Sequence, residues 1–171
     1  MQHVAKYLVL VFLSVTLSAC AGASRPELMS IAPDENNSIQ ISKKYHNAVS
    51  IEDVTGGKET NALLMSKVSS EAFQKALENS LAAYGLLNEN GSYVLHAELL
   101  ALEQPVMGFS FTVDSVVDYT LKKNNSVVFK ETIKASGKAT MGDSPLGVER
   151  LRIANEYSIQ NNIKAFLEKL K

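Results

Sequence analysis

The residues best suited to acid–base or metal chemistry are widely spaced in this sequence. Asp114 and Asp118 alternate with apolar residues along one predicted strand, so both carboxylates face the same side. Four residues of extended chain separate them by roughly 13 Å, which exceeds the roughly 5–9.5 Å between the carboxyl groups of a glycosidase. His46 and His96 lack further ligands at the spacing of a metal motif. We therefore predict no catalytic carboxylate pair, no metal site and no cofactor.

The stretch "TGGKETN" at 55–61 suggests a phosphate-binding loop. Such a loop needs a glycine five residues before the glycine of its Gly-Lys pair, and Ser or Thr after the lysine. Here both positions are glutamate, Glu52 and Glu59. We predict a glycine-containing turn between a strand and a helix, and no nucleotide partner. The sequence also has no Gly-x-Ser-x-Gly nucleophile motif, so we predict no catalytic residues.

Polar residues interrupt an apolar helical stripe in "GVERLRIANE". At 100° per residue, Arg152 and Asn155 project near the middle of that stripe, where a polar group must be paired. Glu131 interrupts the inward face of the last predicted strand in the same way. A buried carboxylate needs a partner, and Arg152 or Arg150 could supply it. We expect a structural polar network, with a functional site as the alternative.

The segment "EQPVMGFSF" is unusually apolar for a connection between two strands. The simpler expectation is that Met107 and Phe109 fold back over the end of the core. The alternative is that they are exposed and contact a partner, because methionine is an adaptable contact residue at binding surfaces.

The first twenty residues have the build of a secretory signal. Lys6 is their only charged residue, and an apolar run too short to span a membrane follows it. Leu17-Ser18-Ala19-Cys20 resembles the lipobox of bacterial lipoproteins, which implies removal of residues 1–19 and lipidation of Cys20. The alternatives are a plain signal peptide with an incidental cysteine, or an N-terminal core helix. Cys20 is the only cysteine in the chain, so a disulfide framework is excluded.

A lipidated Cys20 implies a location in the bacterial envelope. In lipoproteins of this type, a non-acidic residue after the cysteine, here Ala21, implies the periplasmic face of the outer membrane. The membrane partner is then reached through the N-terminal lipid anchor. Residues 20–38 are rich in small and polar residues and contain Pro26 and Pro33, so we predict a flexible tether. The chain has a net charge of −1 and no basic cluster, which argues against a nucleic-acid partner.

Residues 39–171 are expected to form one domain. Apolar residues three to four apart predict one helix from Ser69 or Ser70 to Gly85 and another over about 146–170. Alternation predicts a strand near 48–51, followed by three more strands. In the last of these strands Val127, Phe129, Ile133 and Ala135 are expected to point inward. In the last helix the expected apolar stripe is Val148, Leu151, Ile159, Ile163, Phe166 and Leu170. The order β-α-β-β-β-α predicts an α+β two-layer sandwich, with both helices on one face of a four-stranded sheet.

Segments of this domain resemble a family of small proteobacterial lipoproteins of unestablished function. They are "TGGKETN", "ALENSLAAYGLL", "QPVMGFSFTV", "GVERLRIANE" and "NNIKAFLEKL". Some members carry a UDP-N-acetylglucosamine acyltransferase label, but the hexapeptide repeat of such an enzyme is absent from the sequence. The element order is also similar to that of auxiliary lipoproteins in envelope transport.

This resemblance implies an envelope protein that binds a protein or lipid partner without catalysis, in outer-membrane assembly, transport or maintenance. The alternative is an enzyme that acts on an envelope glycolipid. Exposed, grouped apolar residues would favour the binding protein, and a concave pocket with converging titratable groups would favour the enzyme.

Overall fold

The computed structural model describes residues 22–34, 38–59 and 67–171. The leader 1–19, Cys20 and Ala21 lie outside the described residues. Among the described helices, none is long and apolar enough to cross a membrane. The elements, in chain order, are α2 (Pro26–Met29), the 3₁₀ turn η2 (Lys43–Tyr45), β1 (Val49–Thr55), α3 (Ser70–Ala83), β2 (Tyr93–Glu103), β3 (Phe111–Lys123), β4 (Ser126–Ala139) and α4 (Gly147–Lys169).

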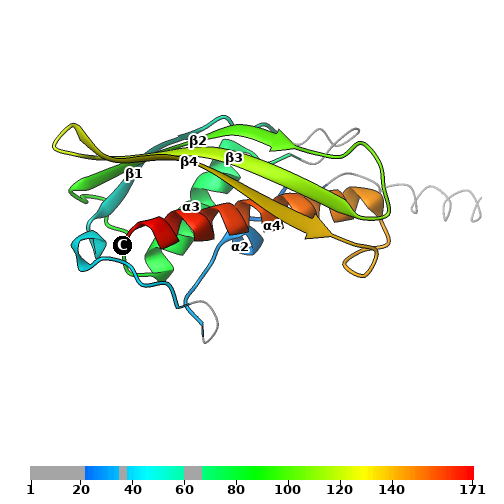
Figure 1. Ribbon diagram of the computed structural model, residues 1–171, viewed down its shortest axis with the longest axis horizontal. Coiled ribbons are helices and arrows are strands. Elements are labelled where there is room, and N and C mark those ends of the chain that lie inside the picture. Colours follow the sequence, from blue (N-terminus) through cyan, green and yellow to red (C-terminus); the bar gives the residue numbers. More distant parts are fainter. Residues whose placement is uncertain (1–21, 35–37, 60–66) are drawn as a thin grey trace, which may run out of the picture.

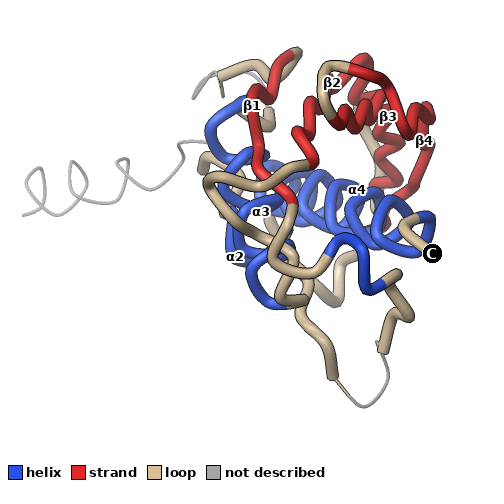
Figure 2. Tube along the Cα trace, turned by 90° about the vertical axis from the view of Figure 1, so that its left-hand side faces the viewer, coloured by secondary structure: helices blue, strands red, loops and turns tan. Residues whose placement is uncertain are grey.

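The strands form one sheet in the order β1-β2-β3-β4. β1 pairs with β2 in parallel through the α3 crossover, whereas β2, β3 and β4 pair antiparallel. Helices α3 and α4 lie side by side beneath the sheet (Figures 1 and 2). The predicted two-layer α+β sandwich is therefore confirmed, with a mixed sheet.

Local signals in the sequence fix the ends of several elements. The side chain of Ser69 accepts a hydrogen bond from Ala72 N–H and caps α3. Gly85 follows α3 with a φ of 66°, which a glycine adopts without strain. Asn124 and Asn125 take φ values of 50° and 61° in the tight turn between β3 and β4, as the "KKNNSV" pattern indicates.

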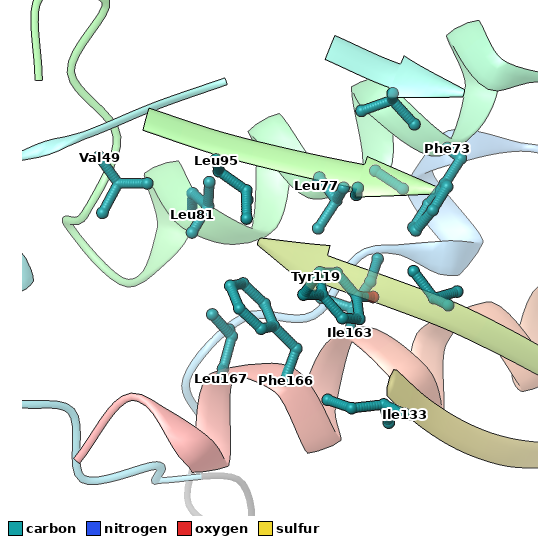
Figure 3. Close-up of a cluster of buried hydrophobic side chains, with 14 of the residues drawn as sticks. Val49, Phe73, Leu77, Leu81, Leu95, Tyr119, Ile133, Ile163, Phe166 and Leu167 are labelled. Atoms are coloured by element: carbon teal, nitrogen blue, oxygen red, sulfur yellow. The ribbon is translucent and has the colours of Figure 1, made fainter. Parts of the chain in front are cut away.

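The hydrophobic core lies between the sheet and the two long helices. Figure 3 shows Leu77 of α3 and Phe166 of α4 directed at Tyr119 of the sheet. The rings of Tyr119 and Phe166 stack with centroids 4.2 Å apart. Two residues expected inside are exposed: Val127 lies beside the β3–β4 turn, and Val148 lies in the first turn of α4. Val127 is 56% exposed and Val148 47% exposed, so neither side chain belongs to the core.

Helix α4 approaches β4 closely at Gly137. A Cβ atom there would lie 2.1 Å from Ser158 N and 2.5 Å from Ala154 O, which are both backbone atoms of α4. Polar side chains complete this contact. Asn162 donates to Ser115 Oγ at 3.1 Å and to Ile133 O at 3.0 Å. The helix therefore lies on the sheet through small and hydrogen-bonded residues near its middle.

The N-terminal segment differs from the flexible tether expected over residues 20–38. Residues 22–34 lie along α3 and α4, and Met29 is fully buried between them. Ile31 N–H donates to Ser80 Oγ at 3.1 Å, and Gln160 Nε2 donates to Ser30 O at 3.1 Å. The burial of Met29 explains why this proline-flanked segment packs rather than remaining a free spacer. The folded domain therefore begins by Gly22 rather than at residue 39.

Replacement of Gly137 tests the close contact between helix and sheet. Gly137→Ala should lower the free energy of unfolding by about 3 kcal/mol, the upper end for overpacking, because the clashing atoms are backbone. Gly142→Ala is the matched control, since its Cβ would meet only Thr140 Oγ1 at 3.5 Å. Urea unfolding of both variants measures the difference, and equal stabilities would contradict the packing described here.

Candidate functional site: an apolar end supported by buried arginines

Exposed apolar side chains gather at one end of the molecule. They come from the β2–β3 loop, the β4–α4 loop and the first turn of α4, and we call them the apolar end: Val106, Met107, Phe109, Met141, Leu146 and Val148. Both loops lie at the same end of the long axis (Figure 1). Met107 is 83% exposed and Phe109 86% exposed, so the expectation that they cover the core is wrong. The β2–β3 loop extends beyond the core residues that Met107 and Phe109 were expected to cover.

Arg150 holds the two loops of the apolar end together. Its side chain is buried, and its Nη1 donates to Ser144 O and Pro145 O, both at 2.9 Å. Its Nη2 donates to Gly108 O at 3.3 Å, and its guanidinium lies 5.3 Å from the ring centroid of Phe111. One side chain of α4 therefore bonds both loop backbones, which fixes how the apolar side chains are presented.

Arg152, one turn into the helix, forms a separate ionic network. Its guanidinium is 4% exposed and pairs with Glu149 and with Glu156, which is 1% exposed. Glu156 Oε1 also accepts the backbone N–H of Arg25 at 2.8 Å. Asn155, fully buried, accepts a hydrogen bond from Gln104 Nε2 at 2.7 Å. The polar residues in the apolar stripe are thus paired, as expected.

The expectation that Glu131 pairs with Arg150 or Arg152 is wrong. Its carboxylate pairs with Lys169 at 3.0 Å, and its side chain is 40% exposed. Glu131 lies in the first half of β4, opposite the end of α4, whereas Arg150 and Arg152 lie in the first turns of that helix. Because β4 and α4 run antiparallel, almost the length of the helix separates these residues. Carboxylates of α4 itself, Glu149 and Glu156, take the place that Glu131 was expected to fill.

The ionic hydrogen bond between Glu149 and Arg152 shifts the pKa values of both residues. The hydrogen bond from Arg152 holds the pKa of Glu149 below its ordinary value. The same bond to Glu149 raises the pKa of Arg152, with the nearby charge of Glu156 acting in the same direction. Arg152 therefore stays charged at every pH the folded protein meets. The pair is a fixed support rather than a proton donor or acceptor.

The N-terminal segment runs beside this network. A Cβ atom at Gly22 would lie 3.4 Å from Arg152 Cδ. Ser24 Oγ donates to Lys67 O at 3.0 Å, and Lys67 Nζ reaches Gln104 Oε1 at 3.0 Å. Gly22, the first described residue, thus lies near the start of α4, beside the apolar end.

The outer face of the sheet carries the dispersed acidic residues that the sequence placed there. Asp114 pairs with Lys134 at 3.1 Å, and Asp118 pairs with Lys130 at 3.4 Å. A hydrogen bond from Ser136 lowers the pKa of Asp114. His96 lies 3.8 Å from Asp53. Within the described residues, no group of His, Cys, Asp and Glu could hold a metal ion. These are cross-strand pairs on a solvated surface.

The glycines of "TGGKETN" have structural roles in their described part, 55–59. Gly56 has a φ of 79°, and a Cβ there would meet Leu99 O at 2.2 Å. Gly57 N–H donates to Ser70 Oγ at 3.1 Å and is therefore not directed at a ligand. The hollow beside Gly56 and Lys58 has a volume of about 90 Å³, below the roughly 300–1,000 Å³ typical of ligand sites. The geometry agrees with a turn.

Sequence reasoning missed the residues that support this end from outside α4. Gln104 and Arg25 lie in segments without clear periodicity, and their partners are 51 and 131 residues away. The acidic residues Glu149 and Glu156 offered a signal, because each stands three or four residues from Arg152 on the same helix.

The comparisons with known proteins identify the fold. No protein-family model matches the sequence, and no curated protein matches it. Among solved structures, a Xanthomonas campestris protein of family DUF330 aligns with a TM-score of 0.56 and 9% identity, over 81% of this chain and 92% of that chain. A candidate lipoprotein of Caulobacter crescentus aligns with a TM-score of 0.49 and 14% identity, over 71% of this chain and 86% of that one.

A minor lipoprotein of Acinetobacter baumannii aligns with a TM-score of 0.40 and 14% identity, over 72% of this chain and 92% of that chain. The DUF330 likeness shows the fold alone, and the two lipoproteins are too distant to transfer a function. The resemblance to a proteobacterial lipoprotein family stays a prediction, and no comparison supports the acyltransferase label.

The buried network of Arg152 and the exposed pair of Glu131 with Lys169 should differ sharply in their contribution to stability. Arg152→Ala should cost about 3–5 kcal/mol, because it removes the buried guanidinium that pairs with Glu156 and leaves that carboxylate only the half-exposed Arg25 Nε at 3.4 Å. Glu131→Ala, which removes the exposed pair with Lys169, should cost about 1 kcal/mol or less. Urea unfolding of the two variants measures this difference. A larger loss for Glu131→Ala than for Arg152→Ala would contradict the assignment of the network.

The lowered pKa of Glu149 predicts a specific pH dependence. A carboxyl group with a lowered pKa in the folded state stabilises the protein above its unfolded pKa and loses this effect as the pH falls. In Glu149→Gln the stability should therefore fall less than in the wild type between about pH 7 and about pH 3. Urea midpoints across this range measure the effect. If stability depended on pH in the same way in both proteins, the hydrogen bond from Arg152 would not lower the pKa of Glu149.

Proposed function

We propose that this protein is a lipid-anchored envelope protein of a Gram-negative bacterium, held at the periplasmic face of the outer membrane through Cys20. It acts as a non-enzymatic binding or accessory component in outer-membrane assembly, transport or maintenance. The observation that carries the binding role is the apolar end. Six of the eleven large apolar side chains exposed among the described residues are there, which marks an interaction surface.

The support for the anchor comes from the sequence. "LSAC" follows an apolar run of signal-peptide length, and Cys20 is the only cysteine. Several acyl chains at one residue would hold the protein almost permanently, since each buried methylene contributes about 0.8 kcal/mol. Anchor and interaction surface then belong to the same end of the molecule, because Gly22 lies against Arg152.

The surface features favour binding over catalysis. The hollow beside Gly56 is small, and the acidic residues of the outer face pair with lysines across strands rather than converging on a pocket. By contrast, Arg150 holds the exposed loop through its backbone, as a presented contact surface requires. An enzyme acting on an envelope glycolipid would have to use the hollow of about 340 Å³ between residues 30–34 and α4, whose lining includes Gln160 and Lys164.

Replacement of the anchor residue tests the proposed location. Cys20→Ser should leave the precursor unprocessed or release the domain from the outer-membrane fraction, whereas the wild type should sediment with it. Mass spectrometry of the N-terminal peptide should find acyl chains on Cys20 of the wild type. A serine variant of mature size that still fractionates with the outer membrane would contradict the lipid anchor.

A further inference from the structure

The described N-terminal segment runs along α4 in the same direction as the helix. Gly22 lies against Arg152, Arg25 N–H bonds Glu156, and Gln160 bonds the carbonyl of Ser30. Followed backwards, this segment therefore leads towards the start of α4. The course is fixed by side chains that are buried or hydrogen-bonded.

The covalent chain then limits how far the proposed anchor lies from the apolar end. Two residues of extended chain span at most about 7 Å, so Cys20 lies within that reach of Gly22. Val148 stands one helical turn before Arg152, a rise of about 6 Å, on the same side of α4. Arg150, in the same turns, bonds the loop that carries Met107 and Phe109. A lipid on Cys20 would keep this end within a short distance of the headgroups.

We propose that the apolar end lies in the interfacial layer of the bilayer that holds the Cys20 anchor, so that its occupant is phospholipid. This inference rests on the proposed lipid anchor and names the partner of the same surface. The six side chains are uncharged Phe, Leu, Met and Val, the types that enter the boundary between headgroups and acyl chains. Anchoring makes the second contact intramolecular, so a small apolar surface suffices.

The short connection also argues against a soluble partner at this surface. Such a partner would have to fit between the apolar end and the headgroups, within the space that two residues allow. A second copy of the chain would meet the same restriction, because its own anchor holds it in the same leaflet. In this orientation the long axis of the molecule points away from the membrane. The β3–β4 turn, at the opposite end of that axis, is then farthest from the bilayer (Figure 1).

The absence of tryptophan from the sequence allows a direct test. Phe109→Trp places the only tryptophan of the chain in the loop, at a side chain that is 86% exposed, and excitation at the red edge of its absorption avoids the tyrosines. The acylated mature variant, which begins at Cys20, is reconstituted in vesicles of phosphatidylethanolamine with a minority of phosphatidylglycerol. Its emission should shift to shorter wavelength relative to the same protein in aqueous buffer after removal of the acyl chains. Brominated phospholipids should quench it.

Val127→Trp is the matched control, because Val127 is 56% exposed and lies beside the β3–β4 turn at the opposite end. Its emission should stay at long wavelength and escape quenching by brominated lipid. Addition of Val106→Asp and Met107→Asp to the Phe109→Trp variant should remove most of the quenching while circular dichroism shows an unchanged fold.

Three results would overturn the inference. Emission of Phe109→Trp that stays at long wavelength in vesicles would place the loop in water. A shift to short wavelength without quenching by brominated lipid would place it against protein, either a partner or a second copy. An N-terminal peptide without acyl chains would remove the anchor and this inference together, whereas the first two results, obtained on acylated protein, would leave the anchor intact.

Discussion

The close contact of α4 with the sheet at Gly137 determines the arrangement of the rest of the molecule. Because Ser158 N and Ala154 O would meet any side chain at that position, the helix can come this near only over a glycine. Asn162 then reaches backbone groups of both β3 and β4, and its Oδ1 accepts the hydroxyl of Tyr119 at 3.0 Å. Burial raises the pKa of Tyr119 well above its usual range, so this hydroxyl remains a donor. A register shift of the helix would break the steric fit and these bonds together.

The same helix divides into two parts with different chemistry. Its C-terminal half contributes Ile163, Phe166 and Leu167 to the core. Its N-terminal half carries two buried arginines. Arg150 bonds the backbone of two loops, and Arg152 pairs with Glu156 of the same helix, whose carboxylate also accepts the backbone N–H of the N-terminal segment. An apolar helix start could not have held the β2–β3 loop by its carbonyl oxygen, because only a donor satisfies that group. The polar half therefore links segments that have little apolar surface of their own to bury.

How far the sequence predicts this structure depends on the range of the interaction concerned. Ser69, Gly85 and the Asn124-Asn125 pair act on their own neighbours, so their effect could be predicted without knowledge of the fold. Alternation also predicted that Asp114 and Asp118 share one side of β3 and that Ile133 of β4 points inward. Periodicity could not predict at which residue of an element its packing against the other layer stops, which is why Val127 and Val148 were expected to be buried and are exposed. The partner of Glu131 and the packing of Met29 depend on residues distant in sequence, and a single sequence carries no signal for such pairs.

The packed N-terminal segment has a consequence for the order of folding. Glu156 and Gln160, which bind Arg25 and Ser30, are made more than a hundred residues later in synthesis. The first part of the domain to be synthesised therefore docks among the last, after α4 has formed against the sheet. Until then, residues 22–34 are an unpacked connection between the N-terminus and the rest of the domain. Their packing on α3 and α4 then shortens the distance that this connection spans. The short distance between Gly22 and the start of α4 is thus a property of the finished fold and is absent from the unfolded chain.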